Sequence, residues 1–184
     1  TIVFTPAPPE PTTYRITAAE SVNTRGGSSG GTNHADTNQM LRVPAASPDP
    51  ASGTEFWVKA RIANGIADPI NTRQGYVKID LSQQYPHASA SRVTLSVYQS
   101  VYLAKVVPVT VSGITDNSWS ESSITWNNAP QEAGTVLDTQ MVRESGWYSF
   151  DVTDFVNSRL GLAEKVVSFR LTDDAAQDLN AQFS

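Results

Sequence analysis

Three stretches of this chain alternate between apolar and polar side chains, and this pattern constrains the fold more than any other feature of the sequence. The stretches cover residues 55–62, 74–81 and 92–99. A period of two is typical of β-strands with one buried face, because successive side chains of a strand point to opposite sides of a sheet. Further strands are predicted over 15–19, 40–43, 105–111, 147–152 and 166–171, with turn-forming residues between them.

A single short segment, residues 154–160, predicts a helix. Thr153 or Asp154 can cap its first turn, and Gly161 ends it. Many strands and almost no helix indicate an all-β fold, here an antiparallel β-sandwich of jelly-roll type. The length of 184 residues suits one such domain. We expect its core to contain Phe56, Val58, Val77, Ile79, Val93, Leu95, Val97, Trp126 and Phe169.

The first 13 residues differ in composition from the rest of the chain. They hold four prolines together with Thr, Ala and Glu, which favours an extended linker, with the sandwich over 14–184. The alternative is a tail packed across the domain. This segment lacks the charged start and apolar run of a signal peptide, and no stretch approaches 18 apolar residues. We therefore expect a piece of a longer protein, with no membrane span.

Composition excludes several kinds of chemistry. The chain has no cysteine, so disulfides, thiol nucleophiles and cysteine-based zinc sites are absent. Its two histidines, His34 and His87, lie far apart and do not have the spacing of metal ligands. A net charge of −5 disfavours nucleic acid as a partner. However, residues 1–111 hold nine basic and seven acidic side chains, so a local basic patch can still form there.

The outward positions of the three alternating stretches combine aromatic and basic side chains. Aromatic rings stack on the apolar faces of sugars, while Lys and Arg pair with carboxylates. The combination favours an acidic polysaccharide as the ligand, although an ordinary solvated face would also be polar. The predicted ligand-binding residues are Trp57, Lys59, Arg61, Tyr76, Lys78, Arg92 and Tyr98.

The most specific motif lies in the second half of the chain. Residues 119–130 read WSESSITWNNAP, and residues 146–153 read GWYSFDVT. Trp119, Ile124, Trp126 and Pro130 are interpreted as structural, because tryptophans in a loop over a sandwich usually fill a core. Glu121 is expected to hold this loop through backbone N–H groups, whereas Asp151 and Thr153 are expected to cap the helix.

Together with YVKIDLS at 76–82 and RVTLSVY at 92–98, these motifs resemble the DNRLRE-type β-sandwich domains. These are related to disaggregatase repeats and to carbohydrate-binding module family 96. The resemblance covers residues 17–184 and implies a non-catalytic, monomeric module that binds an alginate-like acidic polysaccharide. It also implies a covalently linked, secreted polysaccharide-degrading enzyme. Members of the family continue past the equivalent of Phe183, so we expect the last strand to be missing here.

The sequence also offers candidate ligands for a calcium ion. Carbohydrate-binding sandwiches commonly hold a structural Ca²⁺, for which Glu20, Asp36 and Asn38 are the candidate ligands, with Asp173 and Asp174 as further contributors. These acids can equally be solvated loop residues.

The alternatives to a binding module are a structural or adhesive domain of a surface protein, and a small polysaccharide lyase that uses Tyr85 and His87.

Overall fold

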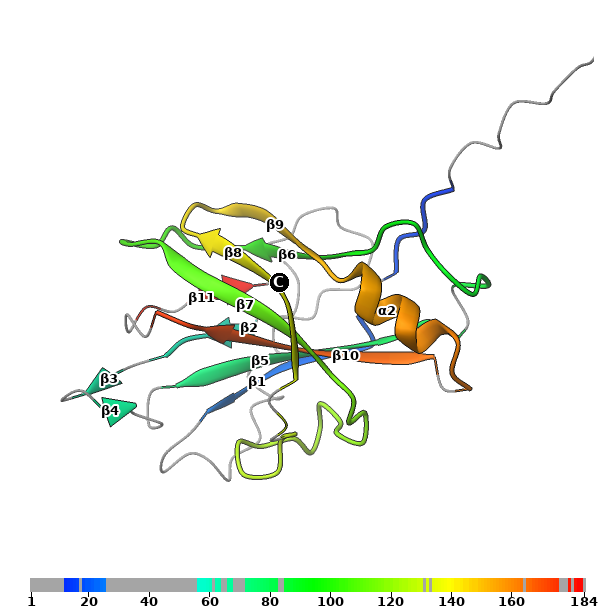
Figure 1. Cartoon of the computed structure of the whole chain (residues 1–184). Helices are drawn as coiled ribbons and strands as arrows, with labels where there is room; N and C mark the ends of the chain where they lie inside the picture. Colours follow the sequence, from blue (N-terminus) through cyan, green and yellow to red (C-terminus); the bar gives the residue numbers. More distant parts are fainter. Residues whose placement is uncertain are drawn as a thin grey trace, which may run out of the picture.

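The computed structural model consists of two antiparallel β-sheets packed face to face, with one short helix at their end (Figure 1). It describes residues 12–16, 18–25, 56–60, 62–63, 66–67, 72–82, 85–130, 132, 134–163, 165–175, 179 and 181–183. The predicted antiparallel β-sandwich is confirmed. Among the described residues, no helix is long and apolar enough to cross a membrane.

The larger sheet, sheet A, has five strands in the order β1-β5-β10-β7-β8. Their bounds are Glu20–Arg25 (β1), Arg73–Asp80 (β5), Val166–Asp173 (β10), Val107–Ile114 (β7) and Thr135–Val142 (β8). Strand β10 therefore lies at the centre of the sheet and pairs with β5 on one side and with β7 on the other.

The smaller sheet, sheet B, has the order β2-β11-β6-β9. Its strands are Phe56–Val58 (β2), Ala181–Phe183 (β11), Thr94–Gln99 (β6) and Gly146–Asp151 (β9). The segment that ends at Phe183 thus forms an inner strand of this sheet. The Gln99 side-chain oxygen accepts the backbone N–H of Gln182 at 3.0 Å, which fixes β11 to β6. Two further strands, Ile62–Ala63 (β3) and Ile66–Ala67 (β4), pair with each other.

The main core lies between the two sheets and contains most of the residues predicted for it. Val58, Val77, Leu95, Val97 and Phe169 are buried there. Ile79 and Val93 are partly buried against the same cluster. The side chain of Phe56 lies outside the described residues. Trp126 is partly exposed and belongs to neither of the two buried clusters, so its assignment to the core was wrong.

A second buried cluster covers the opposite side of sheet A. The segment 115–130, here called the cover loop, folds over β1 and β5 and buries apolar side chains against them. This confirms the structural interpretation of Trp119 and Ile124. Pro130 is buried as well. The part of sheet A that contains β1 and β5 is therefore covered on both faces, and the members of this cluster are Val22, Tyr76, Ile114, Trp119, Ile124 and Ala129.

The helix α2 spans Thr153–Leu160 and lies where β9 ends and β10 begins (Figure 1). The Asp151 carboxylate accepts the backbone N–H of Thr153 at 3.0 Å and its hydroxyl at 2.7 Å, so it holds the first turn. Val156 and Leu160 face the core. Phe155 packs directly on Gly113, where any side-chain carbon would lie 2.6 Å from its ring. The absence of a side chain at Gly113 therefore lets α2 approach sheet A.

Glu132 closes the cover loop. Its carboxylate accepts the backbone N–H groups of Thr115 and Asp116 and the Thr115 hydroxyl. The backbone N–H of Asp116, with the contacts from Thr115, holds the pKa of Glu132 below its ordinary value of 4.5. A lowered pKa stabilises the fold above about pH 4.5, and this contribution disappears as the pH falls through the folded-state value.

Replacing Glu132 by Gln should therefore destabilise the protein more at pH 7 than at pH 3. Because the side chain is largely solvated, we expect a loss of only about 0.5–1 kcal/mol at pH 7. Urea unfolding of both proteins at the two pH values measures this difference. An equal loss at both pH values would show that the ionised state of Glu132 is irrelevant.

Candidate functional site

Tyr76 and Lys78 were predicted on an exposed face, but the structure places both beneath the cover loop. Tyr76 is 0% exposed, and its ring meets the Trp119 ring edge to face at 5.8 Å. Burial raises the pKa of the Tyr76 hydroxyl. The predicted exposure was wrong because alternation separates the two faces of a strand but does not show that a distant loop covers the outer one.

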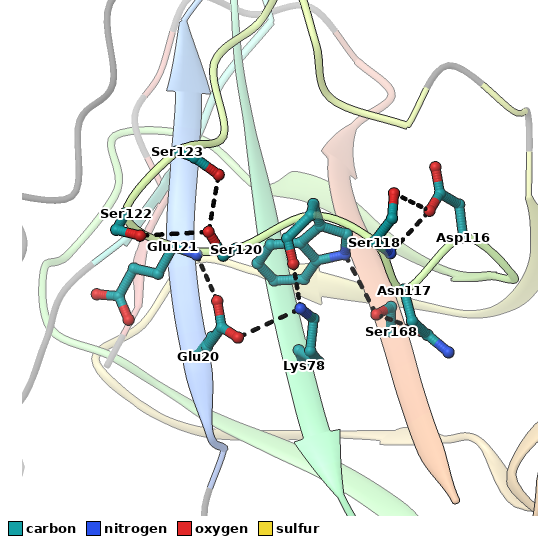
Figure 2. Close-up of polar contacts among 11 residues, drawn as sticks. Glu20, Lys78, Asp116, Asn117, Ser118, Ser120, Glu121, Ser122, Ser123 and Ser168 are labelled. Atoms are coloured by element: carbon teal, nitrogen blue, oxygen red, sulfur yellow. Dashed lines mark hydrogen bonds and ion pairs between the residues drawn. The ribbon is translucent and has the colours of Figure 1, made fainter. Parts of the chain in front are cut away.

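Lys78 holds the cover loop to sheet A through a polar network (Figure 2). Its ammonium group lies 3.2 Å from the Glu20 carboxylate and donates to the backbone carbonyl of Trp119. It also lies 4.4 Å from the centre of the Trp119 ring, within the range of a cation–π contact. The second oxygen of Glu20 accepts the backbone N–H of Glu121. Glu20 thus holds the loop in the way that was predicted for Glu121.

Trp119, at the centre of the network, is also held by hydrogen bonds through its ring N–H. The Trp119 ring N–H donates to the Ser168 hydroxyl at 3.2 Å, and this hydroxyl donates to the side-chain oxygen of Asn117 at 2.7 Å. Figure 2 shows Glu20, Lys78 and Ser168 reaching from the sheet toward the loop residues. The side chains of Lys78 and Glu20 bind other parts of the protein. This network therefore has a structural role, because it holds the cover loop on sheet A.

The predicted calcium ligands are not assembled by the described residues. Glu20 uses both oxygens as above, whereas Asp36 and Asn38 lie outside the described part of the chain. Both oxygens of Asp173 accept backbone N–H groups, at 2.8 and 3.0 Å, and Asp174 accepts two threonine hydroxyls. No group of three or more His, Asp or Glu side chains with metal-binding geometry occurs in the described ranges. Calcium binding stays a prediction.

The other predicted ligand-binding residues do not share one surface with Tyr76 and Lys78. The backbone of Trp57 lies in β2, and Lys59 pairs by its backbone with the start of β5. Arg61 lies outside the described residues. Arg92 and Tyr98 belong to the β6 segment of sheet B, and their outward side faces away from sheet A. The prediction of a single binding face across three strands was wrong because β5 belongs to sheet A, whereas β2 and β6 belong to sheet B.

Sheet B has its own exposed face, formed by the outward side chains of β6 and β9. The alternation of β6 is as predicted: Leu95 and Val97 are buried, while the residues between them are exposed or partly exposed. In β9, Phe150 is buried and its neighbours point outward. The outward residues lie opposite each other in the β6–β9 ladder, and this surface, here called the β6–β9 face, comprises the pairs Thr94–Asp151, Ser96–Ser149 and Tyr98–Trp147.

An aromatic pair occupies one end of the β6–β9 face. The Trp147 side chain is 65% exposed, although large apolar side chains are usually buried. Its ring meets the Tyr98 ring edge to face, with centroids 5.5 Å apart. Next to this pair, the Ser96 and Ser149 hydroxyls lie 2.9 Å apart. An exposed indole followed by hydroxyl groups suits a sugar, whose ring has both apolar C–H and polar O–H groups.

Arg92 lies beyond the other end of this face. The rise of a strand places Thr94 about 13 Å from Tyr98, so the arginine and the indole are well separated. Arg92 and Ser91 line two adjoining cavities of about 560 and 580 Å³. Among the described residues, the Arg92 guanidinium makes no hydrogen bond. It contributes, after the contacts from Thr153, to the lowered pKa of Asp151.

Three rings meet beside the first of these cavities. Tyr14 and Tyr85 lie edge to face at 5.1 Å, and His87 lies 5.6 Å from the first ring and 5.3 Å from the second. The Tyr14 hydroxyl and the His87 Nε2 are 2.9 Å apart. The Tyr85 hydroxyl donates a hydrogen bond to the backbone carbonyl of Ser89. The pair considered for a lyase is thus part of a three-ring cluster with Tyr14.

Sequence reasoning missed Trp147, Ser149 and Tyr14 as candidate site residues. A signal for the first two was present, because residues 146–151 alternate and can be divided into two faces. The signal for Tyr14 was weaker, since the three-ring cluster joins residues that are 73 positions apart.

The chain matches a known protein family. A family model for carbohydrate-binding module family 96 matches residues 12–184. The chain belongs to this family. The predicted resemblance to family 96 is confirmed, and with it the identification of the chain as a carbohydrate-binding module. The match begins at Thr12, so it includes the segment that carries Tyr14.

The family 96 module is also similar to a gellan lyase from a Bacillus species. The two share 27% identity over 141 residues, which cover 72% of this chain. The same alignment covers 5% of the gellan lyase, so the chain spans only a small part of that relative's length.

Proposed function

We propose that this family 96 module binds an acidic, alginate-like polysaccharide and thereby brings an attached secreted polysaccharide-degrading enzyme to its substrate. The observation that carries the proposal is the β6–β9 face, where the exposed Trp147 lies at one end and Arg92 beyond the other. An extended chain can stack a sugar on the indole and pair a carboxylate with the guanidinium.

Several observations support the acidic ligand and the linked enzyme. Arg92 is exposed and its guanidinium makes no hydrogen bond to the described residues, so its N–H donors are available to a ligand. The gellan lyase relative is far longer than this chain, as expected if such modules occur within polysaccharide-degrading enzymes. In this proposal the module itself has no catalytic role, and His87 serves to position Tyr14 through their contact.

Affinity electrophoresis tests the proposal directly. The protein should be retarded in gels that contain alginate or gellan, and less so in gels that contain a neutral glucan. Shallow sugar sites bind weakly, so we expect micromolar or weaker dissociation constants. Because 1 M salt shortens the screening length to about 3 Å, retardation by the acidic polymers should fall strongly there.

Replacing Trp147 by Ala should weaken alginate binding about tenfold or more, since the stacking platform is removed. The matched control is Met141→Ala, which removes an equally exposed apolar side chain from β8 of the other sheet. Equal affinities of the two variants would contradict a site on the β6–β9 face. Tight, salt-insensitive binding to the neutral glucan would exclude the acidic ligand. Retardation by none of the polymers would favour a structural or adhesive domain.

A further inference from the structure

The cavity beside the three-ring cluster has the size and chemistry of a small binding site. Its volume of about 560 Å³ lies within the range of pockets that hold small molecules. The N-terminal segment forms one wall with Thr12, Thr13 and Tyr14. The apolar part of the lining includes the buried Val156 and Leu160 of α2.

The polar groups of this cavity include several hydroxyls and one charge. Ser91, Thr94 and Ser149 contribute hydroxyls, and among the described lining residues Arg92 alone is charged. The adjoining cavity on the other side of Arg92 is different, because Asp151 and Asp154 line it. An anion that approaches the guanidinium from the first cavity therefore meets no lining carboxylate, whereas one that approaches from the second meets two.

The aromatic wall is held in place by contacts of its own. Each of the three rings packs against the other two, and the two tyrosine hydroxyls are engaged with His87 and with the carbonyl of Ser89. Tyr14 remains 39% exposed within this arrangement. Rings held in this way can pack against a sugar without first losing much side-chain freedom.

We propose that this cavity is a subsite for one carboxylated sugar unit, a uronate, of the bound polysaccharide. The inference rests on the proposed function and adds the unit that Arg92 recognises and the direction from which it binds. The guanidinium pairs with the uronate carboxylate, and hydroxyls from Ser91 and Thr94 meet the sugar hydroxyls. The N-terminal segment 12–16 is then part of the binding site.

A titration with single sugars tests the subsite apart from the polymer. The ¹H–¹⁵N NMR spectrum of the full 184-residue chain is recorded with D-galacturonate and, as the neutral control, with D-galactose, each up to tens of millimolar. Galacturonate should shift the amide signals of residues 12–16 and 91–94, while galactose should shift them at least tenfold less at equal concentration. Equal shifts with both sugars, or galacturonate shifts confined to residues 146–149, would overturn the proposal.

Two variants identify the groups responsible. Arg92→Gln should abolish the galacturonate shifts, and Tyr14→Ala should weaken binding several-fold. Lys105→Gln is the matched control, because it also removes one exposed positive charge but lies at neither cavity. If Lys105→Gln weakened binding as much as Arg92→Gln does, the effect would be one of net charge and the subsite would be excluded.

The outcomes separate this inference from the proposed function. If alginate retards the protein but galacturonate leaves residues 12–16 and 91–94 unshifted, the subsite is excluded and the proposed function stands. If galacturonate binds in the cavity but neither acidic polymer retards the protein, the cavity binds only a free uronate, and both polysaccharide binding and a subsite for a polysaccharide unit are excluded. If neither ligand binds, both are excluded.

Discussion

Replacing Trp119 by Ala is expected to lower the free energy of unfolding by about 3–5 kcal/mol, the range for a large aromatic removed from a core. The indole is 5% exposed, packs edge to face against Tyr76 of β5, and donates to the Ser168 hydroxyl of β10. Its removal creates a cavity and leaves that hydroxyl without its donor. It also removes the ring beside the Lys78 ammonium group.

Chemical denaturation of the wild-type and variant proteins measures the loss. Trp147→Ala is the control, because it deletes the same side chain from an exposed position and should change stability by about 1 kcal/mol or less. Similar losses for the two variants would mean that the cover loop contributes little to stability. The comparison also shows whether Trp119 contributes to stability while Trp147 does not.

Replacing Lys78 by Met should be the next most damaging change, with an expected loss of about 2–4 kcal/mol. The Lys78 and Glu20 side chains are 12% and 27% exposed, so the variant leaves a partly buried carboxylate without its cation. Removing one partner of a fully buried ion pair costs about 3–5 kcal/mol, and the residual exposure of Glu20 reduces this cost. The Trp119 carbonyl also loses its donor.

A double-mutant cycle with Glu20→Gln separates the pair from its surroundings. If the charges act on each other, the double variant should be more stable than the sum of the two single losses predicts. Denaturation of the four proteins gives the coupling energy. Additive losses would show that Lys78 acts only through Trp119 and the packing of its own aliphatic stem.

Local pattern was sufficient to predict much of the sandwich. The alternation in 92–99 placed Leu95 and Val97 inside and Thr94 and Ser96 outside, as the structure has them. The helix was expected over 154–160 and spans Thr153–Leu160. These features depend on residues close together in the sequence, where the period of the side chains reports directly on the element that they form.

The candidate site could be predicted only in part, because it depends on which strands share a sheet. Lys78 and Arg92 are both basic residues at outward positions, yet one fastens the cover loop and the other lines two cavities. The difference arises from the position of β5 in sheet A and of β6 in sheet B. Pairing between strands is not encoded in the period of either strand alone.

The alternation within a strand also could not predict that a loop covers the outer face of β5. Tyr76 occupies an outward position, and such a position is solvated only if nothing packs on it. The cover loop reaches it from residues 115–130, about 40 positions further along the chain. The motif predicted that Trp119 fills a core, but not that Tyr76 is the residue it packs against.

The position of β11 has a consequence for the order in which the molecule folds. Phe183 pairs with Phe56 on one side and with Gln99 on the other, so β11 alone connects β2 to the remainder of sheet B within the described residues. Strands β6 and β9 can pair without it. Strand β2 can join sheet B only when a segment more than 120 positions away arrives, and contacts at such separation slow folding. The β6–β9 face can therefore form before β2 joins sheet B.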